Sequence, residues 1–142
     1  MSDPLVETWE INGRINIYLV GALPSLALSA VATSGGRTVG EALAHMHNVR
    51  LMWLKAAAPD LLMGLKKIEK GSSISCSGLV KALNASAAAV TELVARSLSD
   101  DGKVKGFKPH VHAFVGYLVS HESHHRGQIA LALEQSGKPL DK

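Results

Sequence analysis

The sequence has little of several residue types, and each scarcity excludes a class of protein. Its single cysteine, Cys76, can form neither an intrachain disulfide nor a multi-cysteine zinc or iron–sulfur site. This favours a reducing, cytoplasmic compartment. Aromatic residues make up only 4% of the chain, so the core must be aliphatic. Charged residues are also few, at 19%, but the 46% of hydrophobic residues excludes global disorder.

Long apolar runs are also missing. Residues 15–32 carry no charge, but Asn16 and Pro24 interrupt them, short of the ~20 apolar residues of a membrane-spanning helix. The segment in front holds three acidic residues and only one basic residue, the reverse of a signal peptide. We therefore expect neither a cleaved signal nor a membrane anchor.

The basic excess is mild, with a net charge of +3 and a pI of about 9.1. The basic residues are spread along the chain, and only residues 102–108 form a patch, which a solvated loop explains. Charge therefore predicts no nucleic-acid partner.

Helical signals dominate the chain, and no stretch alternates apolar and polar residues as a strand does. Thr38 followed by Glu41 is a capping box, which marks the start of a helix. The expected helices are four long ones and a short one, at residues 5–23, 39–58, 77–99, 109–136 and, for the short one, 61–69. The length of 142 residues fits a single domain, 1–142. We therefore predict an all-α four-helix bundle.

Two histidines interrupt the apolar stripe of the last helix. Phe114, Leu118 and Ile129 continue the helical spacing on either side of His121 and His125. Imidazoles in an aliphatic core are costly unless their nitrogens find partners. Because residues at i and i+4 share one face of a helix, both rings can aim at one divalent ion. The spacing predicts a metal site.

A third ligand must come from a neighbouring helix. The second helix offers His45 and His47, which diverge by about 200° around its axis. Periodicity does not choose between them, since each borders the apolar arc. His124 lies beside the stripe and is a candidate supporting group, whereas His110 and His112 fit the surface at the start of the helix.

Residues 121–125 also spell HExxH, the zinc-protease motif in which the glutamate is a base. The extended form of that motif needs glycine and histidine where this chain has Gln128 and Leu131. No strand is evident to bind an extended peptide. Glu122 points about 100° away from the neighbouring ligand, which favours a surface or inter-helix partner. Arg126 and Gln128 are candidates for orienting a ligand nitrogen or a substrate anion.

Two segments resemble the DinB/YfiT-like superfamily of small metal-binding bundles. They are TVGEALAHM at residues 38–46, with Trp53 and Leu54 downstream, and HESHHRGQI at residues 121–129. The likeness covers nearly the whole chain. It implies four helices with one long crossover and a divalent metal, zinc or nickel, bound by the residues that match the family's ligands, namely His45, His121 and His125.

The resemblance also implies a function, because some members are metal-dependent transferases that use low-molecular-weight thiols. We expect transfer of such a thiol to a small electrophile. The alternative is a non-catalytic metal-binding module of a stress response. Members are often dimers, and Trp9, Tyr18 and the apolar stretch through Leu28 exceed what one small bundle needs. We therefore predict a homodimer.

Overall fold

The computed structural model describes residues 3–140, which form a bundle of four long helices. No β-strand occurs among these residues, and Val104 and Phe107 form an isolated bridge. The prediction of an all-α four-helix bundle is confirmed. The helices are α1 (Pro4–Gly21), α2 (Val39–Ala57), α3 (Cys76–Ser99) and α4 (Val111–Gln135), with short 3₁₀ helices η1 (Ser25–Ser29) and η2 (Pro59–Leu62).

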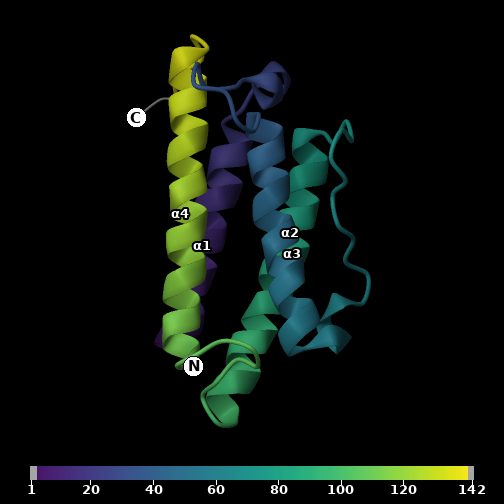
Figure 1. Ribbon diagram of the computed structural model, residues 1–142, viewed down its shortest axis with the longest axis vertical. Coiled ribbons are helices and arrows are strands. Elements are labelled where there is room, and N and C mark those ends of the chain that lie inside the picture. Colours follow the sequence, from purple (N-terminus) through teal and green to yellow (C-terminus); the bar gives the residue numbers. More distant parts are fainter. Residues whose placement is uncertain (1–2, 141–142) are drawn as a thin grey trace.

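Helices α1 and α4 run in one direction and α2 and α3 in the other (Figure 1). Because α2 and α3 are parallel, the connection between them, residues 58–75, must return along the length of the bundle (Figure 1). This is the long crossover that the resemblance implies.

Each long helix begins at a side chain that satisfies a free backbone amide. Thr38 accepts from the Glu41 amide at 3.1 Å, and the Glu41 carboxylate accepts from the Thr38 amide at 2.9 Å, which completes the expected capping box. Asp3, Ser75 and His110 cap α1, α3 and α4. The ends of the four long helices differ from the predicted ones by at most two residues.

The prediction of a short helix at 61–69 is wrong. Only η2 forms there, and Gly64, with a φ of +80°, takes a left-handed conformation that ends it. Side chains of α2 then bind the extended chain beyond it. Asn48 exchanges two hydrogen bonds of 2.9 Å with the backbone of Ile68, and His47 Nε2 lies 2.8 Å from the Lys66 carbonyl oxygen.

The buried residues form two apolar clusters, one at each end of the bundle. Every long helix contributes to both clusters, and on each helix polar buried residues lie between the two sets. The core is therefore divided by a polar layer. Its fully buried members are Asn12, Asn16, His47, Arg50, Ser86 and Glu122.

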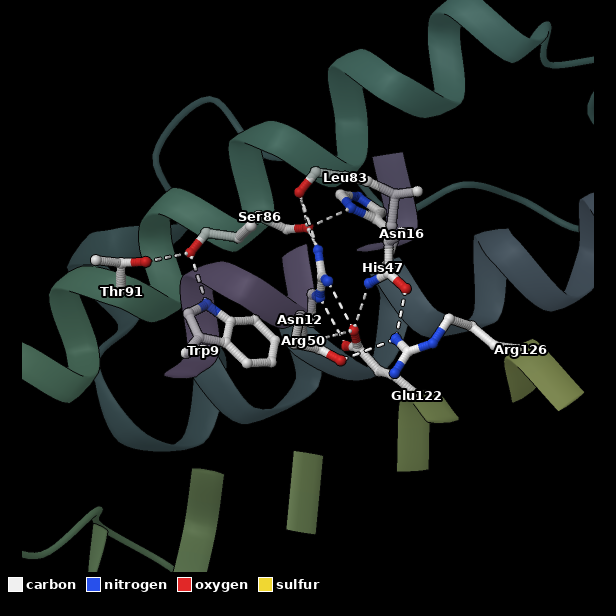
Figure 2. A network of polar contacts seen from close by, with 11 residues as sticks. Trp9, Asn12, Asn16, His47, Arg50, Leu83, Ser86, Thr91, Glu122 and Arg126 are labelled. Carbon is white, nitrogen blue, oxygen red and sulfur yellow. Dashed lines mark hydrogen bonds and ion pairs between the residues drawn. The ribbon is translucent and has the colours of Figure 1, made fainter. Parts of the chain in front are cut away.

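An ion pair between Arg50 and Glu122 lies at the centre of this layer (Figure 2). Its side chains are 0% and 1% exposed, and the guanidinium and carboxylate meet through two bonds, of 2.8 Å at Nε and 2.7 Å at Nη2. Asn12 and Asn16 of α1 donate further hydrogen bonds to the same carboxylate, at 2.9 and 2.8 Å. The remaining nitrogen, Nη1, donates to the Leu83 carbonyl and the Ser86 hydroxyl of α3.

The polar atoms of Glu122 and Arg50 form their hydrogen bonds within the protein and not with solvent. Burial by itself raises the pKa of the Glu122 carboxyl, but the charge and hydrogen bonds of Arg50, with those of the two asparagines, lower it below its ordinary value. The guanidinium carbon also lies 4.9 Å from the centre of the Trp9 ring. Arg50 is thus a buried charge with a full set of partners.

Trp9 is also placed differently from expectation. It is 0% exposed and its indole nitrogen donates to the Ala87 carbonyl, so it contributes nothing to an association surface. Tyr18, in contrast, is 83% exposed and continues a face of α1 that begins with Ile11 and Ile15. The homodimer itself stays a prediction.

By length and composition alone, α3 is apolar enough to cross a membrane. Core helices of globular proteins pass the same test. Leu79, Leu83, Val90 and Val94 of α3 are buried inside the bundle.

We expect Arg50→Met and Glu122→Leu each to lower the free energy of unfolding by about 3–5 kcal/mol, because each leaves an uncompensated buried charge. The double variant should lose much less than the sum of the two, since it buries no lone charge. Urea unfolding of the metal-free protein measures all three. The exposed pair of Arg96 and Asp60 provides the control, since Asp60→Asn should cost at most about 1 kcal/mol. If the double variant instead loses the sum of the two single losses, Arg50 and Glu122 do not stabilise each other as a buried ion pair.

Candidate metal centre

Three imidazoles from two helices meet beside the polar layer. His45 comes from the second turn of α2, and His121 and His125 from successive turns of α4. Each offers a ring nitrogen, and the three nitrogens lie within 4.8 Å of one another. His45 and His121 are half-buried, and His125 is 5% exposed. The structure thus brings together the three residues that the resemblance implies.

A neighbouring side chain sets the tautomer of His125. Its Nδ1 lies 2.8 Å from Gln128 Oε1, which only accepts, so the ring proton is on Nδ1. The lone pair of His125 Nε2 therefore faces the site. It lies 3.1 Å from His121 Nε2. Gln128 performs one of the two roles expected for it, orienting a ligand's free nitrogen.

The geometry of the pair fits a shared cation. Two nitrogens bound to one tetrahedral zinc ion, each at about 2.05 Å, are ~3.3 Å apart, close to the 3.1 Å found here. Among the residues described, His121 Nδ1 is buried without a partner. If its ring proton is on Nδ1, two lone pairs face each other across the site; a cation that accepts both resolves this conflict.

The electrostatics favour the neutral, ligating form of all three rings. Burial, followed by the charge of Arg37, lowers the pKa of His45 to about 4. Burial also lowers the pKa values of His121 and His125, to which Arg37 contributes again. Metal ions compete with protons for these nitrogens, so lowered pKa values prepare the site for metal at neutral pH.

The structure separates His47 from this centre. His47 is 1% exposed and both ring nitrogens are engaged, Nδ1 with the Ser86 hydroxyl at 3.0 Å and Nε2 with the Lys66 carbonyl at 2.8 Å. Since Lys66 offers only an acceptor, Nε2 donates and Nδ1 accepts from Ser86. Of the two histidines that periodicity leaves open, His45 therefore joins the pair.

The remaining histidines lie around or away from the centre. His124 is exposed, with its ring centre 5.1 Å from that of His125. His110 and His112 lie at the exposed start of α4, where the ring of His110 caps the helix. The ring of Tyr117 stacks beside His121 with 6.2 Å between centres, whereas Tyr18 is exposed on α1.

The structure excludes Glu122 as the base of an HExxH protease. Its carboxylate lies within the polar layer, accepts four hydrogen bonds and has a lowered pKa. A general base must have a free lone pair directed at its substrate. Arg126, a candidate for orienting a ligand nitrogen or a substrate anion, instead donates to the side-chain oxygens of Asn12 and Asn16 at 2.8 and 2.7 Å (Figure 2).

A cleft of about 870 Å³ adjoins the centre at His45. The start of α2 forms one wall, and residues 67–74 of the crossover form the other. A larger cleft, of about 1160 Å³, lies by the loop at 100–109 and includes none of the three histidines. The first cleft is therefore the one placed to admit a ligand to the centre.

Sequence reasoning missed Arg37 and the partners of Arg50. An arginine on a buried stripe signals a charge that needs an acid from another helix. Asn12 and Asn16, at i and i+4 on the first helix, were the matching polar signal. Nothing in the sequence marked Arg37, which precedes the cap of α2 in a loop.

We expect His45→Ala and His47→Ala to separate metal binding from stability. His45→Ala should weaken zinc binding on the order of 100-fold or more while leaving the helix content intact. His47→Ala should retain one zinc ion but lose about 1–3 kcal/mol of stability, because buried hydrogen-bonding groups lose their partner. Metal analysis and thermal unfolding measure the two effects. Loss of zinc from the His47 variant alone would refute the assignment.

Protonation should release the metal only at a lower pH than for free imidazole. Protonated imidazole cannot ligate, and the sequence predicts weakening below about pH 6. Because burial lowers all three pKa values from 6.5, and that of His45 to about 4, the zinc dissociation constant should begin to rise at a lower pH than unperturbed imidazoles would give, and rise steeply toward pH 4. Competition with a chelator across this range measures it. A rise that begins at pH 6.5 would contradict the assigned burial.

Comparisons with known proteins agree with the all-α fold and with the resemblance to the DinB/YfiT-like superfamily. Residues 1–140 match the DinB family. The crystal structure of a DinB-like protein from Bacillus cereus superimposes with a TM-score of 0.69 at 18% sequence identity, covering 97% of this chain and 94% of the other. No curated protein sequence shows a significant match.

Proposed function

The chain belongs to the DinB family, and from that premise we propose that it is a metal-dependent transferase that joins a low-molecular-weight thiol to a small electrophile. One divalent ion, zinc or nickel, would be held by His45, His121 and His125. The observation that carries the proposal is that these three nitrogens lie within 4.8 Å of one another and that one of the three residues, His45, lines a cleft.

The composition of the centre suits this chemistry. Three neutral imidazoles add no negative charge and leave at least one coordination position for a ligand from outside the protein. A divalent ion in such a site lowers the pKa of a thiol or a water molecule that binds it. In the transfer, the thiol gives its proton to bulk water, its sulfur bonds to the electrophilic carbon, and the leaving group departs with the electron pair of the bond that breaks.

In this proposal the protein's own residues orient the metal ligands, and none of them provides the reacting thiol. Gln128 holds the ring of His125 with its Nε2 directed at the centre. Cys76 is part-buried at the start of α3, where its sulfur lies 4.0 Å from the Leu23 carbonyl oxygen. This placement of the chain's one cysteine supports a small molecule as the source of the reacting sulfur, and a cytoplasmic location would supply one.

The alternative is a non-catalytic metal-binding module of a stress response. One observation favours it: the carboxylate next to the ligands in sequence, Glu122, is fully engaged by Arg50 and the two asparagines. In that case the ion would act only as a strut between α2 and α4.

A cobalt-substituted sample distinguishes the two functions. Titration with small thiols should produce a sulfur-to-cobalt charge-transfer band, because the open position admits the sulfur. His45→Ala, loaded with cobalt at the same concentration, should give a much weaker band, whereas His47→Ala should keep it. If no biological thiol produces the band with the wild-type protein, the transferase proposal fails and the structural module stands.

A further inference from the structure

The cleft beside His45 has an unequal set of charges. Arg37, Lys67 and Lys70 contribute three positive charges to its walls, and Glu41 and Glu69 two negative ones. One acid is already committed: the Glu41 carboxylate caps α2 through the Thr38 amide, and that hydrogen bond lowers its pKa. The side chains of the cleft therefore present an excess of positive charge to whatever enters it.

Arg37 is the cation of this cleft that acts on the histidine centre. Its charge contributes to the lowered pKa of all three histidines. Within residues 3–140, no carboxylate oxygen lies within 4.0 Å of its guanidinium. The other two arginines near the centre are occupied, Arg50 by Glu122 and Arg126 by the asparagines of α1.

A free guanidinium beside a divalent ion is unfavourable unless an anion lies between them. Like charges repel, and the charge of Arg37, an exposed residue at the mouth of the cleft, reaches the half-buried His45 and His121 and the buried His125. Three neutral histidines do nothing to offset it. His45 lies six residues into α2, about 9 Å along the helix from its first residue, so a small molecule that spans the cleft can contact the ion and Arg37 together.

We propose that Arg37 determines substrate specificity by binding a carboxylate of the thiol substrate whose sulfur approaches the histidine centre. This rests on the proposed function and names the substrate class: small thiols that carry a carboxylate. A guanidinium binds a carboxylate through two parallel hydrogen bonds. A singly charged group matches the single excess positive charge of the cleft.

The test compares pairs of thiols that differ only in charge. We suggest 3-mercaptopropionate, 4-mercaptobutyrate and 6-mercaptohexanoate, each against its uncharged amide, titrated into the cobalt-substituted protein. At least one carboxylate should bind roughly tenfold or more tightly than its amide. Arg37→Gln should abolish that ratio while leaving the dissociation constant of the amide unchanged. Lys55→Gln, which removes one exposed charge from the other end of α2, is the matched control and should keep the ratio.

The outcomes separate this inference from the function on which it rests. If thiols produce the charge-transfer band but every carboxylate binds like its amide, Arg37 has no such role and the transferase proposal survives. If no thiol produces the band, succinate and succinamide are compared on the zinc-loaded protein through the NMR signal of the Arg37 side-chain Nε–H. A shift with succinate alone supports the carboxylate site, and no shift overturns it.

Discussion

The buried ion pair between Arg50 and Glu122 sets the orientation of α2 and α4, and the rest of the site depends on it. At 100° per residue, His121 and His125 lie about 100° and 60° to one side of Glu122. His45 lies about 140° to one side of Arg50 on α2, and His47 about 60° to the other. When Arg50 and Glu122 face each other, His45, His121 and His125 therefore face one common space, and His47 faces α3.

A buried ion pair does not by itself make a protein more stable, since two well-packed apolar residues in its place often give equal or greater stability. Its partners suggest another role. The network draws Asn12 and Asn16 from α1, Arg50 from α2, the Leu83 carbonyl from α3 and Glu122 from α4. Sliding any one helix by a turn would leave a buried charge or amide unpaired, whereas the two aliphatic clusters would tolerate it. The polar layer thus specifies the register of a bundle whose core alone would not.

The sequence was sufficient to predict the features that depend on a single helix, without its neighbours. Capping residues and apolar spacing predicted the four long helices, and the histidine pair followed from spacing within α4. The apolar residues Leu61, Leu65 and Ile68 imitate a helix, but the left-handed Gly64 and the side chains of α2 hold that segment extended. Local spacing carries no information on such partners.

Periodicity could not choose between His45 and His47 for the same reason. It depends on how α2 is rotated against its neighbours, and that rotation is fixed by a contact between residues 72 positions apart. The role of Arg50 was likewise invisible, because periodicity identifies a buried position but not the acid that will reach it from another helix.

Within one turn and a half of α2, four side chains make contacts in three directions: His45 toward the centre, His47 and Asn48 toward the crossover, and Arg50 toward Glu122. An inserted or deleted residue between positions 45 and 50 would rotate one part of this segment by 100° against the other, so all four contacts could not be kept. In α4 the same holds for residues 121–126. We therefore expect related chains to differ in length only in the connections between helices, and to keep the intervals of five residues from His45 to Arg50 and three from Glu122 to His125.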